Sequence, residues 1–168
     1  MPYSLEVLVI NQTEYTDIPF NSTLKLEWEG GRLGKLRLKK TWPIMSSMPG
    51  IWYNILKKDE VYFENTSLIF ETDFDDLITQ NTYYWINEAS KRESFTPLII
   101  RDKYFDEVKQ ILNFLILQSP IKTIMILPLY EKGKIETIQG PILFTHYFEL
   151  IKQRKIPFNV STIVKNDL

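Results

Sequence analysis

Residues 102–128 constrain the fold most strongly, because a helical pattern there leads directly into the pattern of a buried strand. Over residues 102–118 the apolar positions recur at spacings of three and four, which places them on one face of a helix. Asp102 is the expected N-cap, and Ser119-Pro120 marks the helix end. Thr123–Leu127 is uncharged and mostly apolar without alternation, as is typical of a central strand covered on both faces.

The N-terminal half has the patterns of antiparallel strands. Tyr3–Ile10 is a predicted strand with alternate apolar residues on one face. Thr23–Glu29 alternates between apolar and charged residues, Gly30-Gly31 supplies a turn, and the alternation resumes over 35–39. The sequence therefore predicts a β-hairpin in this region.

The remaining elements complete an α+β fold. A second helix is predicted over 146–154, with Thr145 as its cap. Short strands are predicted at 61–64, 67–72, 83–86, 98–100, 135–139 and 158–164, a short helix at 73–79, and loops at 41–54 and 87–94. Strands followed by helix–strand–strand–helix–strand predict a single domain over residues 1–168 with a mixed, largely antiparallel sheet.

Composition excludes several classes of function. Residues 1–84 carry 8 basic and 12 acidic residues, net −4, and residues 85–168 carry 12 and 9, net +3, which is too mild for a nucleic-acid-binding protein. Without cysteine there are no disulfides, thiolate zinc sites or cysteine nucleophiles. We find no signal peptide and no apolar run long enough to span a membrane, so we expect a cytoplasmic protein without membrane association.

The sequence carries no catalytic signature. Its single histidine, His146, has no clustered carboxylates or cysteines, and we interpret it as a surface or structural residue. No phosphate-binding glycine loop, H-E-x-x-H or G-x-S-x-G motif is present. We therefore expect no enzyme activity, no metal site and no cofactor.

Two stretches are candidates for partner binding. The acidic residues Glu71, Asp73, Asp75 and Asp76 form either a solvated helix N-terminus or a patch that faces a basic partner. The stretch Trp42–Tyr53 contains Trp42, Trp52 and Tyr53 between prolines and methionines. Such residues dominate binding hot spots, but a loop folded over the hydrophobic core explains them equally well.

The basic residues between Arg32 and Lys40 could contact a phosphate backbone. Glu27 and Glu29 lie on the paired strand of the predicted hairpin, however. Cross-strand ion pairing is therefore the simpler explanation of this charge run.

The chain resembles the immunity proteins that neutralise contact-dependent or polymorphic bacterial toxins. The stretches that prompt the resemblance are Ser119–Pro128 and the helix–strand unit Phe144–Val164, together with the abundance of Ile, Asn and Lys. The resemblance implies a stoichiometric binder that covers a toxin's active site or an adjacent surface. If the toxin is a basic nuclease, the acidic residues Glu71–Asp76 become the expected docking face. A small-molecule-binding regulatory domain and an enzyme of unknown chemistry remain the alternatives.

Overall fold

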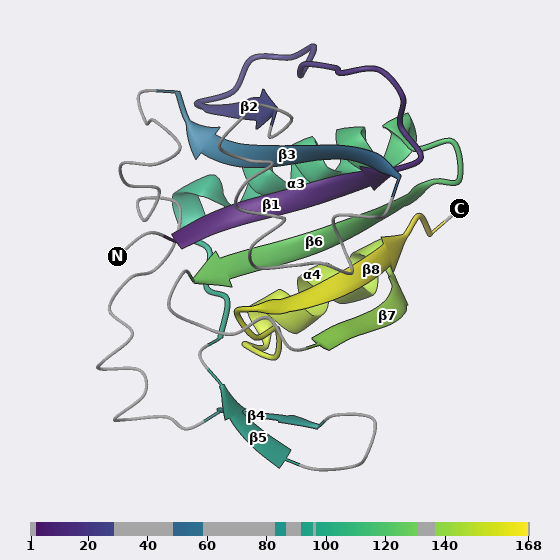
Figure 1. Cartoon of the computed structure of the whole chain (residues 1–168). Helices are drawn as coiled ribbons and strands as arrows, with labels where there is room; N and C mark the ends of the chain where they lie inside the picture. Colours follow the sequence, from purple (N-terminus) through teal and green to yellow (C-terminus); the bar gives the residue numbers. More distant parts are fainter. Residues whose placement is uncertain are drawn as a thin grey trace.

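The structure is a computed structural model that describes residues 3–28, 49–58, 83–86, 92–95, 97–130 and 137–167 (Figure 1). Its main feature is a six-stranded sheet with the order β2-β3-β1-β6-β8-β7. These strands are β1 (Tyr3–Ile10), β2 (Leu24–Trp28), β3 (Gly50–Lys57), β6 (Thr123–Tyr130), β7 (Thr137–Leu143) and β8 (Val160–Lys165). The helices α3 (Asp102–Gln118) and α4 (Phe144–Lys152) cover one face, and β4 (Tyr83–Ile86) pairs with β5 (Arg92–Phe95) in a separate sheet.

The strand directions confirm the predicted α+β fold with a mixed, largely antiparallel sheet. β1 is antiparallel to both β3 and β6, and the pairs β2–β3 and β6–β8 are antiparallel as well. Among the pairs described in this sheet, β7 and β8 alone are parallel. A parallel pair requires a crossover connection, and α4 supplies it. The predicted order helix–strand–strand–helix–strand is confirmed.

The helix and strand at 102–128 form as predicted. The apolar side of α3 is buried, and its bounds match the predicted range. The predicted cap is wrong, because Arg101 is the N-cap and Asp102 is the first helical residue, where its charge still favours the positive helix end. In β6, Ile124 and Ile126 face the helices while Met125 and Leu127 face the other side, and all four are fully buried.

The predicted loop at 41–54 is wrong at its C-terminal end, because β3 begins at Gly50 and pairs with β1 and β2. The strand was not predicted because Pro49-Gly50 is typical of a turn. Gly50 lies opposite Ile10 with φ +141°, and a Cβ atom there would lie 2.3 Å from the carbonyl oxygen of Val9. Glycine is needed for this close approach to β1. The strand that follows it contains aromatic and branched residues, which favour extended backbone.

Four shorter predictions need correction. The predicted loop at 87–94 overlaps β5, and residues 98–100 form no strand, although the Leu98 N–H donates to the Ile156 carbonyl at 2.7 Å. β7 continues through Gly140-Pro141 with a register irregularity, whereas the prediction ends at residue 139. The predicted strand at 158–164 begins two residues later, as β8. The predicted elements at 35–39, 61–64, 67–72 and 73–79 lie outside the described residues.

The buried side chains form two clusters on opposite faces of the sheet. The larger cluster joins α3 and α4 to alternate residues of the strands, and Phe105 and Phe148 bring the two helices together at a centroid distance of 5.8 Å. The smaller cluster, on the other face, contains these residues: Leu8, Ile10, Trp52, Met125, Leu127 and Leu129. Neither α3 nor α4 contributes to it. Across the described ranges, no helix is both long and apolar enough to span a membrane.

Candidate functional site

The predicted partner-binding residues divide between described and undescribed parts of the chain. Glu71, Asp73, Asp75, Asp76 and Trp42 all lie outside the described residues. Trp52 and Tyr53 are consecutive residues of β3 and therefore point to opposite faces of the sheet. Trp52 is 7% exposed and Tyr53 is fully buried. The structure therefore offers neither side chain as an exposed loop contact.

Tyr53 has a structural role that the predicted loop over residues 41–54 did not indicate. Its hydroxyl accepts a hydrogen bond from the Thr16 N–H at 3.1 Å and donates one to Gln12 Oε1 at 2.7 Å. The Tyr15 ring lies beside it, 5.7 Å between centroids. Burial raises the pKa of Tyr53, although the hydrogen bonds oppose that shift. The residue thus anchors the segment between β1 and β2.

The same segment is held to α3 by Glu107. This carboxylate accepts hydrogen bonds from the Ser22 hydroxyl at 2.8 Å and from the Thr23 N–H and hydroxyl, both at 2.7 Å. Burial opposes its ionisation, but the hydrogen bonds outweigh burial and lower the pKa of Glu107. Charge-assisted bonds of this kind stabilise a fold, and they give this carboxylate a structural role.

A row of polar side chains crosses the sheet face that lies away from α3 and α4. Glu27 of β2, Asn54 of β3 and Glu6 of β1 are direct register partners, so their side chains lie side by side. We call these three residues the polar row. Glu6 is 1% exposed and accepts a hydrogen bond from the Ser4 hydroxyl at 3.3 Å. Glu27 pairs with Lys25 at 3.2 Å, and its side chain is 36% exposed. The row therefore runs from the partly exposed Glu27 on β2 to the buried middle of the described sheet.

Asn54 is the most unusual member of the polar row. Its side chain is fully buried, and neither Oδ1 nor Nδ2 has a hydrogen-bond partner in the part of the chain that the structure describes. A buried amide without partners destabilises a protein by roughly 1–3 kcal/mol for each unmade hydrogen bond. The atoms of such a group either form hydrogen bonds with a bound molecule or remain unsatisfied at a cost in stability.

Sequence analysis missed this site, although a weak signal exists. Glu6 interrupts an otherwise apolar strand, and Asn54 lies between Tyr53 and Ile55 in an apolar stretch. A charged or amide residue inside a buried strand is uncommon. The interpretation of residues 41–54 as a loop concealed the register that brings Asn54 and Glu6 together.

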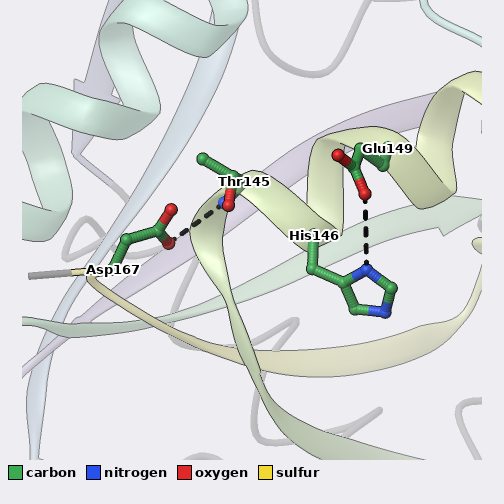
Figure 2. A network of polar contacts seen from close by, with 4 residues as sticks. All are labelled: Thr145, His146, Glu149 and Asp167. Carbon is green, nitrogen blue, oxygen red and sulfur yellow. Dashed lines mark hydrogen bonds and ion pairs between the residues drawn. The ribbon is translucent and has the colours of Figure 1, made fainter.

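The single histidine lies in an exposed network at the start of α4 (Figure 2). Asp167 accepts a hydrogen bond from the Thr145 N–H at 3.1 Å, and bonds from the Thr145 side chain and the helix backbone lower the pKa of Asp167. The predicted cap is wrong, because Thr145 does not cap the helix. The carboxylate of Asp167 instead accepts a hydrogen bond at the helix N-terminus. α4 starts two residues earlier than predicted. His146 Nδ1 lies 3.7 Å from Glu149 Oε2, and both side chains are more than half exposed.

Three exposed apolar residues belong to chain segments at the same end of the sheet. Leu117 ends the apolar part of α3, Ile121 lies in the turn before β6, and Leu143 ends β7; all are 44–54% exposed. Thr123 of β6 and Leu143 of β7 are both register partners of Lys165 in β8, which places these chain segments at one end of the molecule. We call Leu117, Ile121 and Leu143 the apolar end. Apolar residues that gather on a surface are typical of contact sites.

Comparisons with protein-family models, with curated proteins and with solved structures find no match to this chain. In the described ranges, no group of three or more histidine, aspartate or glutamate side chains could hold a metal ion.

Proposed function

We propose that this chain is a non-catalytic protein-binding module, and more specifically an immunity protein that binds and neutralises a cognate bacterial toxin. The observation that carries the proposal is the apolar end. It contains three of the four large apolar side chains that are exposed in the described residues. Exposed leucine and isoleucine side chains are suited to the apolar centre of a protein interface.

The resemblance to immunity proteins supplies the specific part of the proposal. A toxin with a basic surface would be attracted by the acidic residues Glu71, Asp73, Asp75 and Asp76, since complementary charges accelerate association. Trp52 and Tyr53 are predicted partner-binding residues as well, but because both are buried we place the contact on the exposed residues. Both aromatic residues support the sheet from which the apolar end extends.

The first experiment is capture of the partner. The tagged chain is purified from its native cells, bound proteins are identified by mass spectrometry, and the recovered partner is then assayed with increasing amounts of the pure chain. The proposal expects a partner whose toxic activity disappears at equimolar chain. A partner that stays fully active at molar excess would rule out neutralisation.

Variants then locate the contact. Leu143→Asp is expected to weaken partner affinity by at least about tenfold, because a charge replaces an apolar contact. Tyr15→Ser is the matched control, since Tyr15 is 46% exposed but contacts Tyr53 of β3 and belongs to none of the three segments of the apolar end. Reversing the charge of Asp73, Asp75 and Asp76 together tests the acidic docking face separately. Unchanged affinity in this triple variant would refute that face alone.

A further inference from the structure

We propose that the place where α3 meets α4 binds an acidic segment of a protein partner, through the ammonium groups of Lys109 and Lys152. The inference rests on the proposed function and deepens it, because it names the chemistry that the partner brings to this side of the molecule. The contact is separate from the apolar end, which binds through apolar side chains.

Lys109 and Lys152 form a reciprocal arrangement across the two helices. The rings of Phe105 in α3 and Phe148 in α4 meet edge to face, with 5.8 Å between their centroids. Lys109 Nζ of α3 lies over the Phe148 ring at 5.6 Å from its centroid. Lys152 Nζ of α4 lies over the Phe105 ring at 5.2 Å. Each helix therefore places its lysine on the ring of the other, within the range of a cation–π contact. We call these four residues the helix junction.

The sequence explains the arrangement. In each helix the lysine follows the phenylalanine by four residues, and residues at this spacing lie on the same side of a helix. The side of each helix that faces the other thus carries one ring and one ammonium group. A ring that restrains an ammonium group reduces the conformational entropy lost when a partner binds that group.

Neither ammonium group forms an ion pair among the described residues. Glu149 of α4 pairs with His146 instead. Asp167 accepts a hydrogen bond from the Thr145 N–H, and bonds of this kind, followed by the charge of Lys109, lower its pKa. The positive charges of the helix junction are therefore available to carboxylates from outside the chain.

The helix junction combines accessible charge with an apolar base. Lys152 is exposed and Lys109 is half-buried, while Phe105 is half-buried and Phe148 is buried. Carboxylates match this surface, because charge-assisted hydrogen bonds to an ammonium group are stronger than neutral ones. Nucleic-acid binding commonly uses about 6–10 phosphate contacts, so two lysines favour an acidic protein segment.

The test measures the binding of two blocked peptides to the full chain by isothermal titration calorimetry. Tetraglutamate carries the carboxylates, whereas tetraglutamine has the same length and no charge. At low ionic strength we expect tetraglutamate to bind with a Kd of about 1 mM or tighter. Tetraglutamine should bind at least about tenfold more weakly, because it cannot neutralise the two ammonium groups.

Charge-matched variants connect the binding to the helix junction. The double substitution Lys109→Gln with Lys152→Gln should weaken tetraglutamate binding at least about tenfold, and glutamine preserves the helices. The control is Lys103→Gln with Lys165→Gln, which removes the same charge from two exposed lysines outside the junction. This control should weaken binding less than about twofold.

The same variants are then measured with the partner recovered by capture, whose affinity should fall only in the Lys109 and Lys152 variant. No binding of tetraglutamate, or equal losses in the two folded double variants, would overturn the inference. Unchanged affinity of the captured partner for the Lys109 and Lys152 variant would overturn it as well. A partner that binds but keeps its toxic activity counts against the proposed function alone, since the peptide measurements do not depend on neutralisation.

Discussion

The two faces of the six-stranded sheet are built on different principles. The face that α3 and α4 cover is a continuous apolar core, and the anchoring carboxylate Glu107 lies outside it with its hydrogen-bond donors in place. The opposite face combines an apolar cluster with the polar row, in which Glu6 and Asn54 are withdrawn from solvent. Both faces contain buried apolar side chains, but the opposite face also contains the charged and amide side chains of the polar row.

This difference separates residues that hold the fold from candidates for function. Natural proteins retain locally unfavourable groups where a function requires them, and stability then depends on the rest of the molecule. The helix-covered face provides that stability here. The polar row is therefore the place where replacement of a buried polar group can raise stability.

The largest expected effect tests the helix-covered face. Leu115→Ala should lower the free energy of unfolding by about 2–5 kcal/mol, because it leaves a cavity beneath α3. Leu117→Ala, two residues further along the same helix, is the control, since Leu117 is 44% exposed and should change stability by less than about 1 kcal/mol. Urea denaturation followed by circular dichroism measures both. Equal effects of the two substitutions would break the distinction between the buried and exposed sides of α3.

Glu107 tests the contribution of a carboxylate that three hydrogen bonds hold in place. Glu107→Ala should destabilise the fold by about 1–3 kcal/mol at pH 7, and Glu107→Gln by less, because the amide oxygen still accepts hydrogen bonds.

The contribution of Glu107 should also depend on pH in one direction. Its folded pKa lies below the ordinary value of 4.5, so its stabilisation is present above that pH and is lost as pH falls through the folded pKa. The stability difference between the unaltered chain and Glu107→Ala should therefore shrink in acid. A difference that is constant from pH 7 to acid would contradict the role of the charge.

Tyr147 is the counterpart of Asn54 on the helix-covered face, because its hydroxyl is buried and unpartnered among the described residues. Tyr147→Phe should leave stability unchanged or raise it by up to about 1 kcal/mol at pH 7. Burial raises the pKa of Tyr147 far above its ordinary 10.0, so only the unfolded chain ionises it in moderate alkali. The unaltered chain should therefore lose more stability than Tyr147→Phe as pH rises above 10. Parallel alkaline profiles in denaturant titrations would argue against this burial.

The smallest effect on stability is expected for His146, which lies on the exposed surface of α4. His146→Ala should change the free energy of unfolding by less than about 0.5 kcal/mol, because the pair with Glu149 is exposed on the helix surface. Thermal unfolding at pH 5.5 and pH 8 measures this effect. A loss of several kcal/mol would indicate that the network at the start of α4 holds the fold together.

The sequence predicts those elements whose periodicity agrees with their burial. The apolar spacing predicted α3 with the bounds that the structure shows. The absence of alternation in Thr123–Leu127 correctly indicated that β6 is buried on both faces. The prediction failed at β3, where Pro49-Gly50 has the signature of a turn but precedes a strand. Local residue preference does not reveal that Gly50 must lie against the Val9 carbonyl, since that contact is set by tertiary packing.

The candidate sites were harder to predict for the same reason. Alternation identified Glu27 as lying on the outer side of β2, but the neighbour that it faces depends on strand order. The pairing of β1 with β3 makes Asn54 the neighbour of Glu6, although the two residues are 48 positions apart in the chain. The capping of α4 by Asp167 likewise joins residues from two distant elements, which helix signals near Thr145 do not include.

The irregular course of β7 has a consequence for how this protein behaves at high concentration. Among the described strands β7 lies at the end of the sheet order, and an edge strand can recruit strands from other molecules. Pro141 has no N–H to offer to an incoming strand, and the register irregularity between Gln139 and Ile142 interrupts the regular spacing of the edge. Strand β7 is therefore a poor template for a strand of another molecule, which disfavours fibrous self-association through it.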